Sequence, residues 1–403
     1  MIERAEGGRK TRPYNTRLMD IGDLAGFGSR GGRKTCPDIT ARADTYDIVV
    51  VGAGPAGSSA AQAAAQRGAK VLLIDRRQRI GVPVQCAEWA PQWISRYASF
   101  SSKCILQTIE TMVTHLPDGT FIEMKSPGYM LDRSLFDKEL VASAILSGAK
   151  ISIETKAAGP SPEGLVVERG SKHHRVKAKV IIGADGVHSA VARWVELPPA
   201  KTTVALQYEV VNPVPQNHVD IFFHEEYEGG YAWFFPKGRT ANVGMGVIPA
   251  KASLLSKRMD DFLHRLLDAK KLPGIDIVGR TGGSIPCEKP RQTIFGNILL
   301  VGDAAGHAHP ITGGGIFNAV IGGQIAGRIA AEAVERGELR YLENYEIEWR
   351  EIFGRTLTYG AQKRQFLEEN WNKPGVDFQD LIRRTWVGFT EYYEDRRKVN
   401  TQG

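Results

Sequence analysis

A glycine-rich turn between two regular segments places the strongest constraint on the fold. The β-branched residues 48–51 predict a buried parallel strand, and the alanine-rich residues 58–67 predict a helix. Gly52, Gly54 and Gly57 lie between them in the spacing Gly-x-Gly-x-x-Gly. In a nucleotide-binding turn the first glycine permits the tight bend and the second lets the backbone approach a pyrophosphate. The third lets the helix pack closely on the strand. The pattern therefore predicts a dinucleotide-binding βαβ unit.

The residues around this turn agree with such a unit but do not identify the dinucleotide. Ala56 lies at the N-terminus of the helix, where unpaired N–H groups and the positive end of the helix dipole bind phosphates. Residues 71–74 predict a second strand that ends at Asp75, at the separation expected for an acid that binds the ribose hydroxyls. Arg76 adjoins the same site, and together with Arg77 it is compatible with a 2′-phosphate. FAD and NAD(P) therefore stay alternatives at this point.

Two later segments each predict a strand that ends in a turn with an acidic residue. The first strand covers residues 180–183 and the second covers residues 297–301. The turns that follow them carry the pairs Asp185–Gly186 and Gly302–Asp303. At the second turn the carboxylate is placed to hold the ribityl chain of a flavin.

A glycine run follows the last of these strands. Gly313, Gly314 and Gly315 precede a helix that we expect to begin near Ile316, and Pro310 lies just before them. The N–H groups of this run are placed to face the pyrimidine edge of a flavin, where they stabilise negative charge on the reduced ring. A plain NAD dehydrogenase has no need of such a return strand near its C-terminus. The three segments together therefore predict FAD.

The order of these motifs resembles that of flavoproteins built like p-hydroxybenzoate hydroxylase, and within that group the chain is most similar to the geranylgeranyl reductase family. The similarity extends over roughly residues 44–335. The resemblance implies that Arg133 lies beside the cofactor, while Ala87 stands where the family usually has glycine, close to the bulky Trp89. Four further segments resemble those of the family: residues 81–88, 131–137, 183–193 and 231–236, the last followed by Gly244-Met-Gly246.

The motifs and strand patterns predict an α/β fold in which a Rossmann-type FAD-binding domain is interleaved with an antiparallel β-sheet substrate domain, followed by C-terminal helices. We expect a basic flexible extension at residues 1–43, which carry nine Lys or Arg against five Asp or Glu. The expected FAD-binding parts are residues 44–99, 129–200 and 281–340, the substrate parts are 100–128 and 201–280, and the helical region is 341–403.

An alternating aromatic stripe marks the substrate domain. Tyr231, Trp233 and Phe235 alternate as on one face of a strand, and Pro236 ends the run. Such a stripe by itself is more typical of core packing. The resemblance implies that these four residues instead form the wall of an apolar substrate channel. Aromatic faces can bind either prenyl chains or aromatic rings.

Cys86 and Glu88 are the candidate catalytic residues, because they lie in a loop that the resemblance places near the flavin. A lone cysteine is most often a small buried hydrophobe, but here a proton donor or a steric gate is an alternative. Glu88 is either a proton relay or a salt-bridge partner. We expect no metal site, since His307 and His309 lack carboxylate or cysteine partners nearby in the sequence.

Composition points to a chain of the reducing cytoplasm. No stretch approaches the roughly 20 apolar residues of a membrane-spanning helix, and no apolar signal segment begins the chain. The four cysteines form no Cys-x-x-Cys pair. The chain has a net charge of +7 but contains no nucleic-acid-binding motif, so we expect no nucleic-acid partner. For the basic extension, peripheral contact with the inner membrane surface, docking to a protein partner such as an electron donor, and simple disorder stay open.

We expect an FAD-dependent oxidoreductase that reduces carbon–carbon double bonds of a prenyl or similar apolar substrate by hydride transfer from reduced flavin. The reductant is NAD(P)H or another transient donor, since the chain has no second dinucleotide fingerprint. The alternative is a flavin monooxygenase that hydroxylates an aromatic substrate, including a side chain on another protein as in quinone cofactor maturation. A flavin-binding maturation factor without turnover is a third hypothesis.

Overall fold

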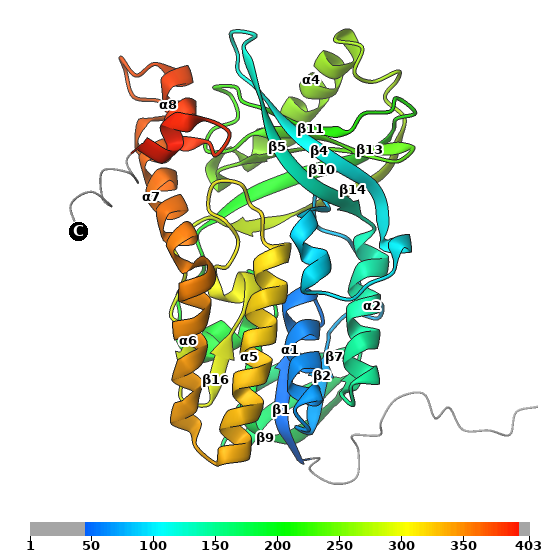
Figure 1. Cartoon of the computed structure of the whole chain (residues 1–403), viewed down its shortest axis with the longest axis vertical. Helices are drawn as coiled ribbons and strands as arrows, with labels where there is room; N and C mark the ends of the chain where they lie inside the picture. Colours follow the sequence, from blue (N-terminus) through cyan, green and yellow to red (C-terminus); the bar gives the residue numbers. More distant parts are fainter. Residues whose placement is uncertain (1–44, 395–403) are drawn as a thin grey trace, which may run out of the picture. The chain divides into compact units, whose positions relative to one another are not determined.

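A computed structural model of the chain describes residues 45–394. The expected basic extension at residues 1–43 lies outside these residues. Within them the fold is α/β and contains two sheets: one carries the first glycine turn, and the other lies above it as a roof (Figure 1). Across residues 45–394, no helix combines the length and the apolar composition that crossing a bilayer requires.

The lower sheet is built around the strand of the first glycine motif. Its eight strands include the path β15-β16-β9-β1-β2-β6, and the neighbours from β16 to β6 are parallel. Residues 48–50 are completely buried because β1 lies in the centre of this sheet with helices packed over it. The strand bounds are β1 (Thr45–Val51), β2 (Val71–Ile74), β6 (Lys150–Ser152), β7 (Thr155–Ser161), β8 (Gly164–Arg169), β9 (Lys172–Gly183), β15 (Ile294–Phe295) and β16 (Ile298–Leu300).

Helices α1 (Pro55–Gln66), α2 (Arg133–Leu146) and α5 (Ile316–Arg336) line up beside this sheet, and α3 (Ala190–Trp194) is a short turn after β9 (Figure 1). Two glycines let α5 approach α1 closely. A Cβ atom on Gly323 would lie 2.2 Å from the Ala56 carbonyl oxygen, and one on Gly327 would lie 2.0 Å from that of Ala60. This close packing ties the helix of the first motif to the helix that follows the last motif.

The roof sheet also has eight strands, in the order β14-β10-β13-β12-β11-β4-β5-β3. All neighbouring strands are antiparallel except β11 and β4, so the expected, mostly antiparallel pattern is present. Its strands are β3 (Trp89–Pro91), β4 (Ile105–His115), β5 (Phe121–Leu131), β10 (Thr202–Val211), β11 (His218–Phe222), β12 (Ala232–Lys237), β13 (Thr240–Val247) and β14 (Ile277–Pro286).

Two of the expected domain limits, after residues 128 and 280, fall inside strands of the roof. Strand β5 continues to Leu131 because Met130 pairs with Trp89 of β3. Strand β14 continues to Pro286 because it stays paired with β10 along its length. Both pairings join segments that are distant in sequence, so no local pattern marked where these strands end.

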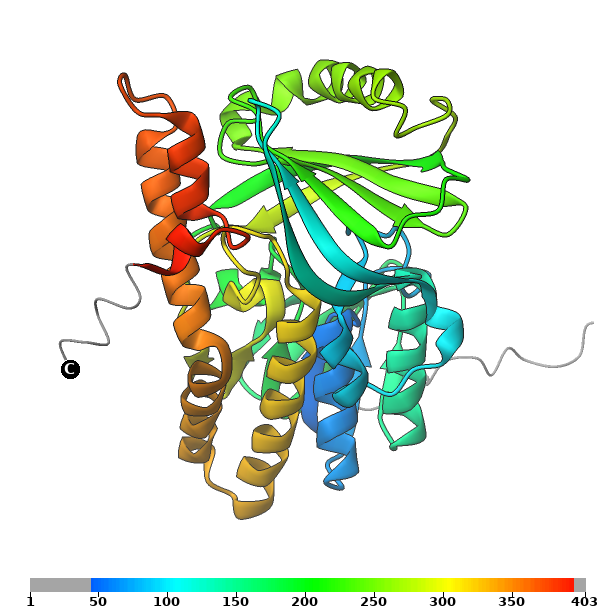
Figure 2. The same cartoon turned by 45° about the horizontal axis from the view of Figure 1, so that its top comes forward.

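Helix α4 (Leu255–Asp268) covers the outer face of the roof (Figure 2). Its buried residues Leu255, Met259, Phe262 and Leu266 recur at helical spacing and pack against the sheet in one apolar cluster.

The C-terminal region is helical, as the sequence predicts, and forms a column beside both sheets (Figures 1 and 2). Trp349 and Phe353 anchor its lower part in the core of the lower sheet, whereas Trp371 and Trp386 join the core under the roof. The column consists of α6 (Glu343–Trp349), a π-helical turn (Arg350–Gly354), α7 (Arg355–Asn370) and α8 (Phe378–Thr385).

Candidate active site

A cavity of about 610 Å³ is lined by residues from both sheets and from the C-terminal region. The three motif segments predicted to bind FAD meet along one part of it. Most of the residues predicted from the sequence reach this cavity, whereas Gly57, Pro310 and Pro236 do not. The predicted residues that line it are Gly52, Gly54, Ala56, Asp75, Arg76, Cys86, Glu88, Arg133, Asp185, Gly186, Tyr231, Trp233, Phe235, Gly302, Asp303, Gly313, Gly314, Gly315 and Ile316.

The glycines of the first turn divide their roles as the spacing predicts. Gly52 has a φ of +100°, and a Cβ atom there would lie 2.4 Å from the Ala184 carbonyl oxygen. A Cβ atom on Gly57 would lie 1.8 Å from the Gly52 carbonyl oxygen, so this glycine serves close packing behind the cavity. No atom lies within 4 Å of the Cβ position of Gly54, which leaves the space before α1 open. Because α1 also has no side-chain cap, its first N–H groups are free to bind a phosphate.

Two of the predicted acids also hold the backbone of the turns that surround them. The Asp75 carboxylate accepts hydrogen bonds from the N–H groups of Ala53 and Arg77, both at 2.8 Å. Asp185 accepts the Ser189 hydroxyl at 2.5 Å and the Ala190 N–H at 2.6 Å, which secures the start of α3. Each carboxylate oxygen has two lone pairs, so both acids retain acceptor capacity toward the cavity.

Asp303 differs from these acids. Among residues 45–394, no group donates a hydrogen bond to its carboxylate, which lines the cavity after the left-handed Gly302 (φ +66°). Burial raises the pKa of Asp303, an effect that the nearby Arg133 guanidinium partly offsets. A carboxylate that opens onto the cavity without a protein donor can accept hydrogen bonds from a ligand, and the hydroxyl groups of a ribityl chain are suitable donors. Together with the open space at Gly54, this carboxylate fits a bound flavin dinucleotide.

The glycine run before α5 adds a second helix N-terminus at the cavity. Gly313 has a φ of +67°, and α5 begins at Ile316 without a side-chain cap. The N–H groups of Gly313 and Gly314 already donate within the loop, to the His309 carbonyl at 2.8 Å and the Thr312 hydroxyl at 3.3 Å. The uncapped N–H groups at the start of α5 are therefore the ones that suit the pyrimidine edge of a flavin. Pro310 lies behind this run, where a Cβ atom on Gly360 of α7 would contact it at 3.1 Å.

His307 and His309 support this loop. Burial lowers the pKa of His307 to about 3, and its ring packs against Trp349 and Phe353. Burial lowers the pKa of His309 to about 4, and its Nδ1 accepts the N–H groups of Ile311 and Thr312, both at 3.3 Å. Within the described part of the chain, no group of three or more His, Cys, Asp and Glu side chains is arranged to hold a metal ion.

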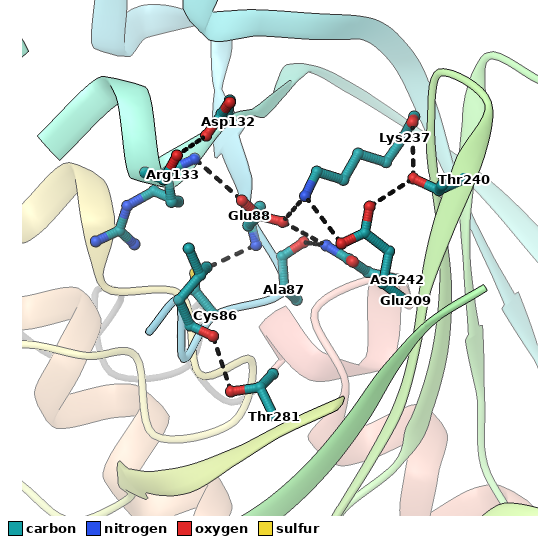
Figure 3. Close-up of polar contacts among 12 residues, drawn as sticks. Cys86, Ala87, Glu88, Asp132, Arg133, Glu209, Lys237, Thr240, Asn242 and Thr281 are labelled. Atoms are coloured by element: carbon teal, nitrogen blue, oxygen red, sulfur yellow. Dashed lines mark hydrogen bonds and ion pairs between the residues drawn. The ribbon is translucent and has the colours of Figure 1, made fainter. Parts of the chain in front are cut away.

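Cys86 lines the same cavity as the three motifs. Its Sγ accepts the Glu88 N–H at 3.2 Å (Figure 3). Burial raises the pKa of Cys86 above its ordinary value, and the Arg133 guanidinium opposes this rise. At neutral pH the side chain is therefore a protonated thiol rather than a thiolate.

Glu88 is held from three sides by donors (Figure 3). Its carboxylate accepts the Arg133 N–H at 3.0 Å and the Asn242 amide at 2.9 Å, and it lies 2.5 Å from the Lys237 ammonium. Burial alone would lower the pKa of Lys237, but the Glu88 carboxylate raises it above its ordinary value. Glu88 also has a φ of +70°, a conformation that a non-glycine residue adopts only when its surroundings hold it there.

Arg133, which the resemblance places beside the cofactor, lines the cavity and is aligned by a neighbour in its own helix. Its guanidinium donates to both carboxylate oxygens of Asp137, at 2.9 and 3.1 Å. Burial opposes the charge of Arg133, but Asp137 and other nearby acidic groups raise its pKa above the ordinary value. The sequence contained the signal for this pair in the spacing of four residues, which places both side chains on one helix face.

The aromatic stripe faces the cavity with alternate residues only. Tyr231, Trp233 and Phe235 line it, and the Tyr231 hydroxyl donates to the Thr312 carbonyl at 2.6 Å. Pro236 does not line the cavity, because consecutive strand residues point to opposite faces.

Several lining residues had no signal in the sequence. Met112 and Met124 come from the β4–β5 hairpin, Gln207 comes from β10, and Trp386 and Val387 come from the C-terminal region. The C-terminal tail therefore closes part of the cavity. These residues approach the site only through the packing of the roof sheet and of the C-terminal region, and the spacing of sequence motifs carries no information about that packing.

Comparison with known proteins identifies two matching family models. A model described as geranylgeranyl reductase catalytic domain matches residues 201–283, and one described as FAD dependent oxidoreductase matches residues 47–186. The first covers most of the roof sheet and the second covers the first two motifs.

Similar proteins include the digeranylgeranylglycerophospholipid reductase of Methanosarcina acetivorans, 36% identical over 337 residues, or 78% of this chain and 83% of that protein. The protein of the same name from Methanocaldococcus jannaschii is 36% identical over 343 residues, 81% of this chain and 88% of that protein. A solved structure of a geranylgeranyl bacteriochlorophyll reductase-like protein from Thermoplasma acidophilum is 27% identical, with a TM-score of 0.78, and covers 88% of this chain and 99% of that chain. A flavin-dependent brominase, 18% identical with a TM-score of 0.67 over 89% of this chain and 99% of its own, shares the fold.

Proposed function

Because this chain belongs to the geranylgeranyl reductase family of FAD-dependent oxidoreductases, we propose that it reduces the carbon–carbon double bonds of a prenyl lipid of the digeranylgeranylglycerophospholipid type. One observation carries the proposal: a protonated thiol, an aromatic wall and the three FAD motifs line a single cavity. Reduction of an isolated double bond needs a hydride, a proton and a dry apolar surface, and this arrangement supplies places for all three.

The residues that would hold FAD are those of the three motifs. The open N-terminus of α1 at Gly54 would receive the pyrophosphate, Asp75 would bind the ribose and Asp303 would accept the ribityl hydroxyls. The uncapped N–H groups at the start of α5 would interact with the flavin ring. When bound and reduced, FAD supplies the hydride.

The rest of the cavity suits an apolar chain. Side chains from β4, β5, β11, β12 and the C-terminal tail give it a hydrophobic lining, in which aromatic rings and flexible methionines predominate. Such walls bind an isoprenoid by dispersion and by the exclusion of water. The lining residues are Met112, Met124, Ile221, Trp233, Phe235 and Trp386.

Cys86 is the proton donor in this proposal. Burial keeps its proton on Sγ at neutral pH. After Sγ donates this proton to the alkene carbon, the sulfur remains a thiolate that accepts the Glu88 N–H, and the Arg133 guanidinium stabilises its charge. Solvent then returns the proton. Glu88 already accepts three donors, so its contacts favour the salt-bridge alternative, in which it positions the loop.

The electron donor in this proposal is either NAD(P)H or a reduced protein. Structures of flavin-dependent halogenases and of a hydroxylase share this fold at identities of 16 to 18%, and so low an identity transfers only the fold. The family relationship favours reduction over hydroxylation.

The decisive experiment mixes FAD-loaded, dithionite-reduced protein with digeranylgeranylglycerophospholipid under anaerobic conditions. We expect the flavin to be reoxidised and the lipid to gain one hydrogen molecule for each double bond that reacts, as mass spectrometry would show. If the lipid stays unsaturated, the proposed reduction fails. A parallel reaction of the reduced protein with an aromatic substrate and ¹⁸O-labelled O2 then tests the alternative, because label in the product would make the protein a monooxygenase.

We also propose that the protein meets its lipid at the membrane surface. Support comes from the turn after β3, where Trp93 is 53% and Tyr97 is 44% exposed. The Arg96 guanidinium lies 4.2 Å from the centre of the Trp93 ring. Exposed aromatic rings next to a cation suit the interface of a bilayer with anionic headgroups. A cytoplasmic location remains a prediction from the sequence.

A further inference from the structure

The side chain of Gln207 connects the loop that carries Cys86 to the aromatic wall. It comes from β10, is 6% exposed and lines the cavity. Its Nε2 donates to the Cys86 carbonyl oxygen at 3.0 Å, and its Oε1 accepts the Trp233 indole N–H at 3.0 Å. The backbone carbonyl only accepts and the indole only donates, so the two contacts together determine which way the carboxamide points.

This contact depends on a row of residues that crosses four strands of the roof. Trp233 of β12 lies opposite Gly244 of β13, Gly244 lies opposite Gln207 of β10, and Gln207 lies opposite Thr281 of β14. A Cβ atom on Gly244 would lie 2.2 Å from the Trp233 ring. The missing side chain at Gly244 therefore lets the indole extend across β13 and reach the carboxamide on β10.

Thr281 of this row and Asn242, two residues before Gly244 on β13, hold the loop of residues 81–88 at further carbonyl groups. The Thr281 hydroxyl donates to the Val84 carbonyl at 2.8 Å, and the Asn242 amide donates to the Ala87 carbonyl at 3.2 Å. Among these three anchors, Gln207 is bonded both to the residue that carries the thiol and to a residue of the substrate wall. It therefore determines the spacing between them.

We propose that Gln207 is a positioning residue that sets the Cys86 thiol at the correct distance from a substrate chain lying against Trp233. This inference rests on the proposed function, in which Cys86 donates the proton. Proton transfer requires close approach of donor and acceptor, and a misplacement of about 1 Å costs roughly a hundredfold in rate. The wall itself persists without Gln207, so binding of the lipid depends on it much less.

Two substitutions separate the two contacts of Gln207. Gln207→Leu removes both. Gln207→Glu keeps an acceptor for the Trp233 indole, but an ionised carboxylate cannot donate to the Cys86 carbonyl. Gln292 provides a surface control, because its Nε2 also donates to a backbone carbonyl, that of Ile294, but it is exposed and does not line the cavity.

The first measurement is independent of any substrate. Iodoacetamide labelling of Cys86, followed by mass spectrometry of its peptide, reports how firmly the loop is held. The buried Cys104 and Cys287 serve as internal references. We expect Cys86 to be labelled about tenfold faster in Gln207→Leu and Gln207→Glu, and at the wild-type rate in Gln292→Leu. Labelling of Cys86 at the wild-type rate in both Gln207 variants would overturn the proposal, whatever the substrate proves to be.

The second measurement compares kcat with KM on the prenyl lipid. We expect both Gln207 variants to lose about 10- to 100-fold in kcat, with KM changed by less than about threefold. A loss confined to KM would make Gln207 a substrate-binding residue and contradict the proposal. If Gln207→Leu does not fold, the nearly isosteric Gln207→Glu decides both measurements. If the lipid is not reduced by wild-type protein, the proposed function fails while the labelling result still stands.

Discussion

The Lys237 ammonium lies 2.5 Å from the Glu88 carboxylate, and their side chains are only 12% and 2% exposed. Removing one partner from a buried ion pair leaves the other charge without compensation. We expect Lys237→Met to lower the free energy of unfolding by about 3 kcal/mol, as measured by urea denaturation. The double variant Glu88→Gln/Lys237→Met should recover part of this loss. Lys177→Met breaks the exposed pair with Glu163 and should cost less than about 1 kcal/mol. Equal losses in the two single variants would show that burial of the first pair is unimportant.

The pH dependence of turnover should report the Cys86 thiol. Its pKa is raised by burial, so the donor keeps its proton through neutral pH and loses it only as pH rises through the raised value. We expect kcat to fall only above the ordinary thiol pKa of about 8.5. Cys86→Ser should lower kcat by about 10²- to 10⁴-fold, because a hydroxyl is a much weaker acid. FAD absorbance should be unchanged in this variant. A wild-type profile that falls at or below the ordinary thiol value would assign the proton to another group.

Asp303 should show opposite effects on stability and on cofactor binding. Its raised pKa means that the folded chain favours the protonated form, so its ionisation costs stability as pH rises through that pKa. Asp303→Asn removes the buried charge and should stabilise the apoprotein near neutral pH by about 1 kcal/mol. It should also weaken FAD binding about tenfold, because hydrogen bonds to a charged acceptor are the stronger ones. Thermal melting of the apoprotein and fluorescence titration with FAD measure the two effects, with the exposed Asp261→Asn as control. Unchanged FAD affinity would remove Asp303 from the cofactor site.

Gly244→Ala tests the close approach of Trp233. The new Cβ atom would lie 2.2 Å from the indole, so the ring must move and lose its bond to Gln207. We expect a loss of about 1–3 kcal/mol in the free energy of unfolding. Gly279 of β14 is the matched control, because its Cβ position is 3.5 Å from the nearest atom. Gly279→Ala should change stability by less than about 0.5 kcal/mol. Similar costs at both glycines would mean that the indole does not require Gly244.

The exposed aromatic turn after β3 should mediate binding to lipid vesicles. We expect Trp93→Ser/Tyr97→Ser to reduce co-sedimentation with vesicles that contain anionic phospholipid by about tenfold, and added salt to weaken wild-type binding. Leu146→Ser is the control, because Leu146 is 88% exposed at the end of α2. If Leu146→Ser weakens binding as much as the double variant, the turn is not the docking site.

The local geometry of the first glycine turn could be predicted closely from the sequence. Gly52, Gly54 and Gly57 have the conformations and contacts that their spacing indicates, because the geometry of a strand–turn–helix unit is set within a few residues. The alternation of Tyr231, Trp233 and Phe235 correctly identified one face of a strand for the same reason. Local spacing also misled in one respect, since Pro236 continues the motif in sequence but lies on the opposite face.

The reacting half depended on the tertiary structure. Gln207 meets a residue 121 positions away at Cys86, and Asn242 meets one 154 positions away at Glu88. Trp386 enters the same cavity from the far end of the chain. The sequence by itself determined the FAD-binding turns and the aromatic face, because backbone geometry within a strand or a turn sets the positions of near neighbours. Only the tertiary structure decided which partners hold Cys86 and Glu88, because contacts across a hundred residues follow from the packing of whole sheets.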